Sequence, residues 1–354
     1  MYGLRLLVEA IPHDLFGLMT LDLYTPDFLN TISHWLNTDN ESFKQSIIDF
    51  FNRLCEVPFN LAERFLDSTN ILNQVKSALM NKEYKERSTR RMYLVLLSSL
   101  TNVEHRSFML HLDLWKWILD FFLKAKKGTS FYLTSEIMQH MDVSIGKEIL
   151  RGAEGVLYKK LEEMMVSEIL EITEAGLAVL STVISIDDYY AEEFLWKAKG
   201  LTVILSKLKE KSCVQECMMV ISSLNYSREI YREALIDSDL LDYLIGIVYE
   251  RGAGKPMKTY ILIILCEFFS KGSSKQVLKL IHRGILDVII LNCQIFKSIL
   301  LLDALRRAIK RVMEVSVKKP KHVVQKLYEL NVCQVFSKII EWQREFDSIA
   351  QTQV

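Results

Sequence analysis

The chain has 354 residues, half of them apolar, and contains only 5 prolines and 13 glycines. An apolar fraction this high supports a continuous core and excludes a disordered chain. The 44 basic residues balance the 44 acidic ones, so no overall charge draws the chain toward nucleic acid or a membrane. No proline occurs between Pro58 and Pro256, whereas a β-rich domain needs frequent turn residues. We therefore expect helices joined by short loops.

A short motif recurs along the chain: a glycine or other turn residue, followed by an apolar residue that opens an amphipathic helix. Glycine suits this position because it accepts a tight backbone turn between two helices. Such a period is the signature of a repeat array, whose units must stack on one another to bury their apolar faces. We predict one helical repeat domain over residues 1–354. Its units open near Phe28, Ile71, Leu114, Val156, Leu201, Leu240, Ile285 and Val332, at spacings of 39 to 47 residues.

A longer helix follows each opening helix and ends in a second recurring pattern, apolar-apolar-x-x-apolar. Leu96–Leu100 and Val220–Leu224 are examples. Between this pattern and the next opening there is room for one more short helix. The second x of the pattern shares the period of the openings, so two independently chosen marks agree. It falls at Arg53, Ser99, His140, Thr182, Ser223, Glu267 and Arg311.

The opening motifs Gly155-Val156-Leu157 and Gly200-Leu201 resemble those of the armadillo repeat, which has a short, a medium and a longer helix in each unit. The resemblance covers roughly residues 20–345, as degenerate units. It implies an all-α, right-handed solenoid of seven or eight repeats, in which the longer helices line a concave groove that holds other proteins. HEAT repeats have the same period with two helices in each unit, and they are the close alternative.

The chain departs from importin-alpha-type armadillo proteins, which carry Trp and Asn four residues apart on the longer helix. The residues at the second x stand in place of the Asn, and none of them is Asn. The Trp-like positions hold Asp49, Val95, Glu136, Ala178, Met219, Ile263 and Arg307. Binding of nuclear-import cargo is therefore not expected. The resemblance still marks these candidate groove residues for a partner: Arg53, Arg91, Ser99, His140, Thr182, Ser223, Glu267, Arg307 and Arg311.

Charge is unevenly distributed along the array. Residues 154–193 hold ten acids against two lysines, and residues 297–326 hold nine bases against two acids. A smaller basic cluster ends at Arg91. One interpretation is that these patches select a partner segment of matching polarity. The other is that they are solvated helix faces with internal pairs, such as Asp303 with Arg307 and Lys310 with Glu314.

No catalytic, metal or cofactor motif is found. Gly252–Pro256 lacks the first glycine and the Ser or Thr of a phosphate loop, and it is better interpreted as the start of a longer helix. The seven histidines include no HExxH motif, and the six cysteines form no CxxC pair. Cysteines scattered in apolar contexts are typical of reduced thiols inside a cell. We expect a protein that is not an enzyme, located in the cytoplasm or nucleus.

No membrane segment is expected. Acidic residues interrupt the first apolar stretch, so no signal peptide is predicted. Tyr260–Phe269 is too short to span a bilayer, and Ile285–Leu302 contains Asp287 and Lys297. Both are interpreted as core helices.

A scaffold or adaptor that binds a protein or peptide segment is the favoured function. A nucleic-acid-binding helical solenoid is the alternative, although the neutral net charge disfavours it. Apolar residues continue nearly to both termini, without a polar capping unit at either. The chain is therefore expected either to form part of a larger protein or to assemble with a partner, or with itself, through its ends.

Overall fold

In a computed structural model, the described residues are 40–56, 71–80, 112–126, 128–293 and 298–318, together with isolated positions elsewhere. Every regular element in these ranges is a helix. By internal contacts the chain divides into two compact units, Met1–Ile186 and Asp187–Val354. The predicted openings at Phe28 and Val332 lie outside the described residues.

In the first unit, the described opening and long helices pack against their counterparts one repeat further along. The opening helices α8 and α11 are in contact, and so are the long helices α9 and α12. The short helix α10 packs against α8 and α12. The described helices are α4 (Glu41–Glu56), α6 (Ile71–Met80), α8 (Leu112–Lys124), α9 (Thr129–Gln139), α10 (Val143–Leu150), α11 (Glu154–Met165) and α12 (Leu170–Ile186).

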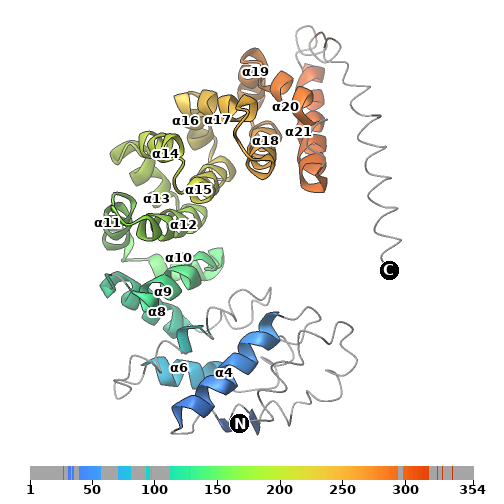
Figure 1. The fold of residues 1–354 in the computed structure, drawn as a ribbon. Coiled ribbons are helices and arrows are strands. Elements are labelled where there is room, and N and C mark those ends of the chain that lie inside the picture. Colours follow the sequence, from blue (N-terminus) through green and yellow to red (C-terminus); the bar gives the residue numbers. More distant parts are fainter. Residues whose placement is uncertain are drawn as a thin grey trace. The chain divides into compact units, whose positions relative to one another are not determined.

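The second unit repeats this order of opening, long and short helix (Figure 1). The opening helices α14, α17 and α20 stack in series, as do the long helices α15, α18 and α21 and the short helices α16 and α19. The bounds are α13 (Asp188–Glu192), its π-helical continuation η4 (Glu193–Lys197), α14 (Gly200–Lys209), α15 (Val214–Tyr226), α16 (Glu229–Ile236), α17 (Asp239–Tyr249), α18 (Lys255–Lys271), α19 (Ser274–His282), α20 (Ile285–Cys293) and α21 (Ile299–Lys318).

Local signals in the sequence explain where these helices begin. Helices α6 and α20 begin at the predicted openings themselves, and α8, α11, α14 and α17 begin one or two residues earlier. Gly284 precedes α20 with a φ of 73°, a conformation that strains residues with a side chain. Ser273 and Gln276 form a capping box at the start of α19. Pro256 lies in the first turn of α18, where a missing N–H has no cost.

The core runs through the long helices. In α18, every residue from Ile264 to Phe269 is buried, so this helix is covered on nearly all sides. The two apolar stretches of the sequence fall in α18 and in α20 with the start of α21. Among the described helices, none has the length and apolar composition needed to cross a membrane.

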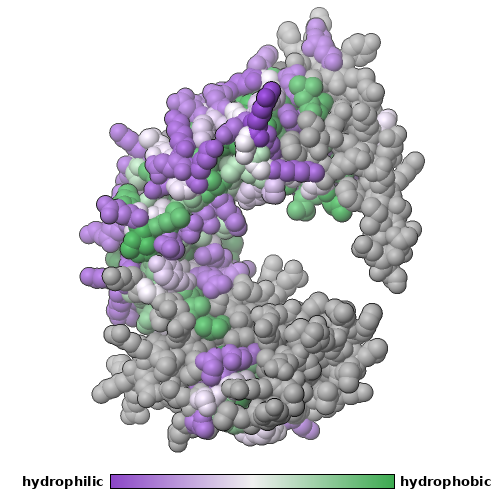
Figure 2. Space-filling view, in the orientation of Figure 1, coloured by the Kyte–Doolittle hydropathy of each residue, from purple (hydrophilic) through white to green (hydrophobic). Residues whose placement is uncertain are grey.

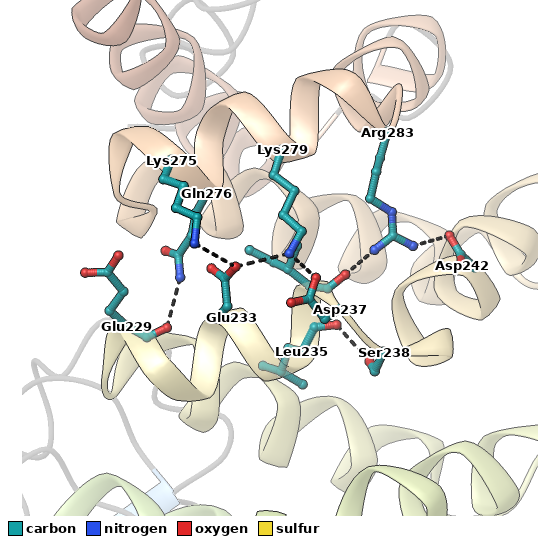
Figure 3. A network of polar contacts seen from close by, with 11 residues as sticks. Glu229, Glu233, Leu235, Asp237, Ser238, Asp242, Lys275, Gln276, Lys279 and Arg283 are labelled. Carbon is teal, nitrogen blue, oxygen red and sulfur yellow. Dashed lines mark hydrogen bonds and ion pairs between the residues drawn. The ribbon is translucent and has the colours of Figure 1, made fainter.

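Polar contacts join the short helices of neighbouring repeats. Figure 3 shows them between α16 and α19. Lys279 pairs with Glu233 at 3.1 Å and also with Asp237. Arg283 pairs with Asp242 and donates to a backbone carbonyl at the end of α16. These groups are partly solvated, so each pair adds only modestly to stability but helps to fix the register between repeats.

Arg232 is the exception, because it is only 6% exposed. Its Nη2 and Nε donate to the carbonyl oxygen of Asn225 at 2.7 and 3.0 Å, near the C-terminal end of α15. Its Nη1 lies 3.5 Å from Oε1 of Gln276 in the next repeat. A terminal helix carbonyl has no partner within its own helix, and a cation there is favoured by the helix dipole. Burial lowers the pKa of Arg232, which remains bonded through these acceptors.

We expect Arg232→Met to lower the free energy of unfolding by about 2–4 kcal/mol, because the buried Asn225 carbonyl loses its donors. Arg228→Met is the matched control. Arg228 is exposed and pairs with Asp188 at 2.7 Å, so its loss should cost less than about 1 kcal/mol. Urea unfolding followed by circular dichroism measures both variants, and equal costs would contradict the assigned role of Arg232.

A close helix crossing in the first unit depends on Gly176 of α12. A Cβ added there would lie 2.7 Å from Cβ of Met164 in α11, closer than two carbon atoms can pack. In α17, by contrast, a Cβ added at Gly246 meets nothing within 4 Å. Substitution of Gly176 therefore tests the tight helix crossing, whereas substitution of Gly246 tests helix propensity alone.

Gly176→Ala should lower the free energy of unfolding by about 1–3 kcal/mol, since the crossing helices must move apart. Gly246→Ala should raise it by about 0.5–1 kcal/mol, because alanine is the better helix former. Thermal unfolding of the two variants is the measurement. A stabilised Gly176→Ala variant would show that the crossing is not tight.

Candidate functional site

Six of the nine candidate groove residues lie in the described part of the chain with their side chains. Arg53 lies in α4, but its side chain is not among the described ones. Arg91 and Ser99 lie outside the described residues. The other six are His140, Thr182, Ser223, Glu267, Arg307 and Arg311.

In the first unit, two candidates meet where α12 crosses the end of α9. The Thr182 hydroxyl donates to the carbonyl oxygen of Gln139 at 3.1 Å, one repeat back along the chain. His140 follows as the C-cap of α9 and is half-buried. Burial lowers the pKa of His140, while the nearby Glu136 carboxylate opposes this effect. The Thr182 side chain and the backbone N–H of His140 thus have structural roles here, whether or not a partner contacts these residues.

In the second unit, Ser223, Glu267 and Arg311 lie on the successive long helices α15, α18 and α21. Glu267 is the buried member of the three, at 9% exposed. The Tyr226 hydroxyl of α15 donates a hydrogen bond to its carboxylate. Burial raises the pKa of Glu267, and this increase is partly offset by the Tyr226 hydrogen bond and by the positive charges of Arg307 and Lys271. One carboxyl group thus links side chains from all three helices.

Tyr226 covers this acid and is itself 46% exposed. The Lys271 ammonium lies 4.9 Å from the centre of its ring, within range of a cation–π contact. Burial and the Glu267 carboxylate raise the pKa of Tyr226, so its hydroxyl remains a donor at neutral pH. The hydrogen bond to Glu267 and the contact with Lys271 thus hold the Tyr226 ring in place.

The arginines of α21 complete the site. Arg307 pairs with Asp303, as predicted from their spacing. Arg311 donates from Nε to the carbonyl oxygen of Gly272 at 3.1 Å and from Nη1 to Glu314 at 3.1 Å. Glu314 therefore pairs with Arg311, whereas its predicted partner was Lys310. The side chain of Arg307 is 46% exposed, which leaves it within reach of a ligand.

The sequence analysis missed Tyr226 and Lys271. They lie three and four residues after Ser223 and Glu267, which is one helical turn further along the same face. That spacing was the available signal. We define the long-helix face of the second unit as Tyr226, Glu267, Lys271, Arg307 and Arg311.

The long-helix face offers an aromatic ring, two cationic groups with exposure to solvent and a buried acid, but no nucleophile next to a base. Among the described residues, no group of three or more His, Cys, Asp and Glu side chains could hold a metal ion. Cys217 and Cys266 are buried free thiols. Burial raises the pKa of Cys217 to about 12, so this thiol stays protonated and unreactive. The chemistry that the long-helix face supports is binding.

We expect Glu267→Gln to raise the free energy of unfolding at neutral pH. The folded-state pKa of Glu267 is raised above its ordinary value of 4.5, so ionisation of this carboxyl opposes folding. Below that value the acid is protonated in both states and the penalty vanishes. The advantage of the glutamine should therefore grow as the pH rises from about 4.5. Urea titrations of both proteins between pH 4 and pH 8 test this, and a constant difference would contradict it.

No protein-family model matches the chain, and no curated protein matches it. Among solved structures, the crystal structure of an engineered protein is similar over 96% of this chain and 80% of its own, with a TM-score of 0.59 at 11% identity. A designed armadillo repeat protein covers 80% of this chain and 99% of its own at 11% identity, but its TM-score of 0.39 is too low to support an argument. At 11% identity, the similarity to the engineered protein shows a shared fold and nothing more. The chain is an all-α solenoid of helical repeats.

Proposed function

We propose that this chain is a non-catalytic scaffold or adaptor of the armadillo type, and that its long-helix face binds a segment of a partner protein. The observation that carries the proposal is the placement of Tyr226, Lys271 and Arg307, one from each of three successive long helices, around Glu267. A ligand that runs across these helices can contact one of these side chains on each. The order of opening, long and short helix supports the armadillo type, because HEAT repeats have two helices in each unit.

The chemistry of the long-helix face indicates an extended segment with acidic side chains. Carboxylates on the ligand would face Lys271 and Arg307, and an apolar or aromatic residue would stack on the Tyr226 ring. Glu267 is buried and accepts a hydrogen bond from Tyr226, so it repels an incoming carboxylate less than an exposed acid would. The proposal extends to the other candidates from the sequence, Ser223, Thr182 and His140, and to Arg53, Arg91 and Ser99.

A nucleic-acid-binding solenoid is the second reading of the sequence. Phosphate recognition needs a basic stripe, and this chain has as many acidic as basic residues. The arginines of α21 are also partly engaged by Asp303 and Glu314 on their own helix. A protein partner is therefore the better supported ligand.

A location in the cytoplasm or nucleus belongs to the same proposal. Cys217 and Cys266 are buried free thiols of the second unit. Buried thiols without disulfide partners are common in reducing compartments.

Selection from a displayed library of random peptides should yield ligands for the whole chain that are enriched in Asp and Glu. The double variant Lys271→Glu with Arg307→Glu should bind these peptides at least about tenfold more weakly, because it reverses two charges that face the ligand. Tyr226→Ala should weaken binding by a similar factor through loss of the stacking surface. Fluorescence anisotropy with labelled peptides measures each affinity.

Lys209→Glu is the matched charge control, since Lys209 is exposed on the opening helix α14. It should leave the affinities unchanged. Equal binding by the double variant and the wild type would refute the proposed site, and so would a library that yields no enriched ligand.

A further inference from the structure

The turn between α11 and α12 in the first unit exposes a cluster of apolar side chains. Val166 is 71% exposed, Ile169 is 45% exposed and Leu170 is 48% exposed. Three large apolar residues lie at the surface within five consecutive positions. Figure 2 shows hydrophobic surface over α11 and α12, bordered by hydrophilic side chains. A clustered apolar patch of this kind is unusual on a protein that has no partner there.

The repeat architecture does not require apolar residues in this turn. The same turn between opening and long helix reads Ala-Lys-Lys-Gly at 125–128, Glu-Lys-Ser at 210–212 and Glu-Arg-Gly-Ala-Gly at 250–254. Each of these turns is polar or small, as expected of a solvated loop. The segment between α20 and α21 is not polar throughout, since it reads Gln-Ile-Phe-Lys-Ser at 294–298. The three polar turns still show that the fold does not require Val166, Ile169 and Leu170 in the turn and at the start of α12.

The backbone of this turn is held firmly, so the apolar side chains are directed outward. Thr173 of α12 is buried, and its hydroxyl lies 3.3 Å from the carbonyl oxygen of Met164 and 3.1 Å from that of Ser167. The amide of Ile169 donates to the Ser167 hydroxyl at 3.1 Å. A surface that is ordered before binding loses little conformational entropy when a partner docks.

Exposed acids surround the apolar cluster. Glu162 and Glu163 lie at the end of α11, Glu168 in the turn and Glu171 in the first turn of α12. None of these four carboxylates forms an ion pair with another side chain in the part of the chain that the structure describes. Lys160 is a nearby cation that interacts electrostatically with Glu163, and its ammonium donates to the carbonyl oxygen of Ala125 at 2.7 Å. Lys159 of α11 is also exposed. The four glutamates outnumber these two lysines, so the net charge around the patch is negative.

We propose that the α11–α12 turn is a second docking surface, which binds a basic amphipathic helix of a partner protein. Val166, Ile169 and Leu170 would contact the apolar face of that helix, and the four glutamates would pair with Lys or Arg at the edges of that face. Charge complementarity selects this occupant, because an acidic segment would be repelled. This surface lies in the first unit and does not depend on the long-helix face.

Two labelled synthetic helices provide the test. They share one leucine face, and the polar face carries lysine in one peptide and glutamate in the other. The full chain should bind the lysine peptide and not the glutamate peptide in fluorescence anisotropy. The triple variant V166S/I169S/L170S should weaken binding at least about tenfold. The quadruple variant E162Q/E163Q/E168Q/E171Q should also weaken it and should flatten its dependence on salt.

Matched controls separate this surface from general stickiness. Ile230→Ser and Leu291→Ser remove equally exposed apolar side chains of the second unit, and they should leave binding unchanged. The double variant Lys271→Glu with Arg307→Glu should also bind the lysine peptide as the wild type does, so the two proposals can fail separately. The substituted side chains of the turn and the controls Ile230 and Leu291 are exposed, so the unfolding curves of those variants should match that of the wild type.

Three results would overturn the inference. The first is equal affinity of the triple variant and the wild type for the lysine peptide. The second is equal binding of the two peptides by the wild type. The third is a dimer in analytical ultracentrifugation that the triple variant abolishes, because a second copy of the chain would then be the occupant.

Discussion

The structure depends on the packing of each helix against its counterpart one repeat further along the chain. A unit of three short helices cannot bury its own apolar surface, so stability comes from the interfaces between units. The long helices show this most clearly, since α18 is covered on nearly every side by the helices around it. Because the same interface recurs, a side chain on one long helix has a near-equivalent position on the next. This regularity aligns Ser223, Glu267 and Arg311, and Tyr226, Lys271 and Arg307 lie about one helical turn from those positions.

Buried polar contacts between repeats add specificity to this apolar packing. Thr182 bonds to the end of the preceding long helix, and Arg232 links the end of α15 to Gln276 of the next short helix. Groups of this kind are costly when unpaired, so they favour one register of stacking over others. The hydrogen bond between Tyr226 and Glu267 belongs to the same class but lies at the surface. There the same contact also holds two side chains of the proposed binding face in place.

The candidate site was only partly predictable from the sequence. The repeat period placed Ser223, Glu267 and Arg311 at equivalent positions on successive long helices, because periodicity depends on local helix geometry. It did not identify Tyr226 or Lys271, since a period marks one position on each helix and not its neighbours one turn away. It also treated Glu267 as a groove residue exposed to a ligand, whereas packing leaves it only 9% exposed. Thr182 proved to be engaged at a helix crossing, and His140 is the half-buried C-cap of α9.

The sequence by itself determined the all-α class, the repeat period and the starts of most described helices. These features follow from apolar periodicity, capping residues and glycine turns, which act over a few neighbouring residues. The tertiary structure decided which polar groups meet, because partners such as Tyr226 and Glu267 lie 41 residues apart and approach only when repeats stack. It also decided that Val166, Ile169 and Leu170 are exposed. In the sequence they look like core residues, and only the fixed backbone of their turn directs them toward solvent.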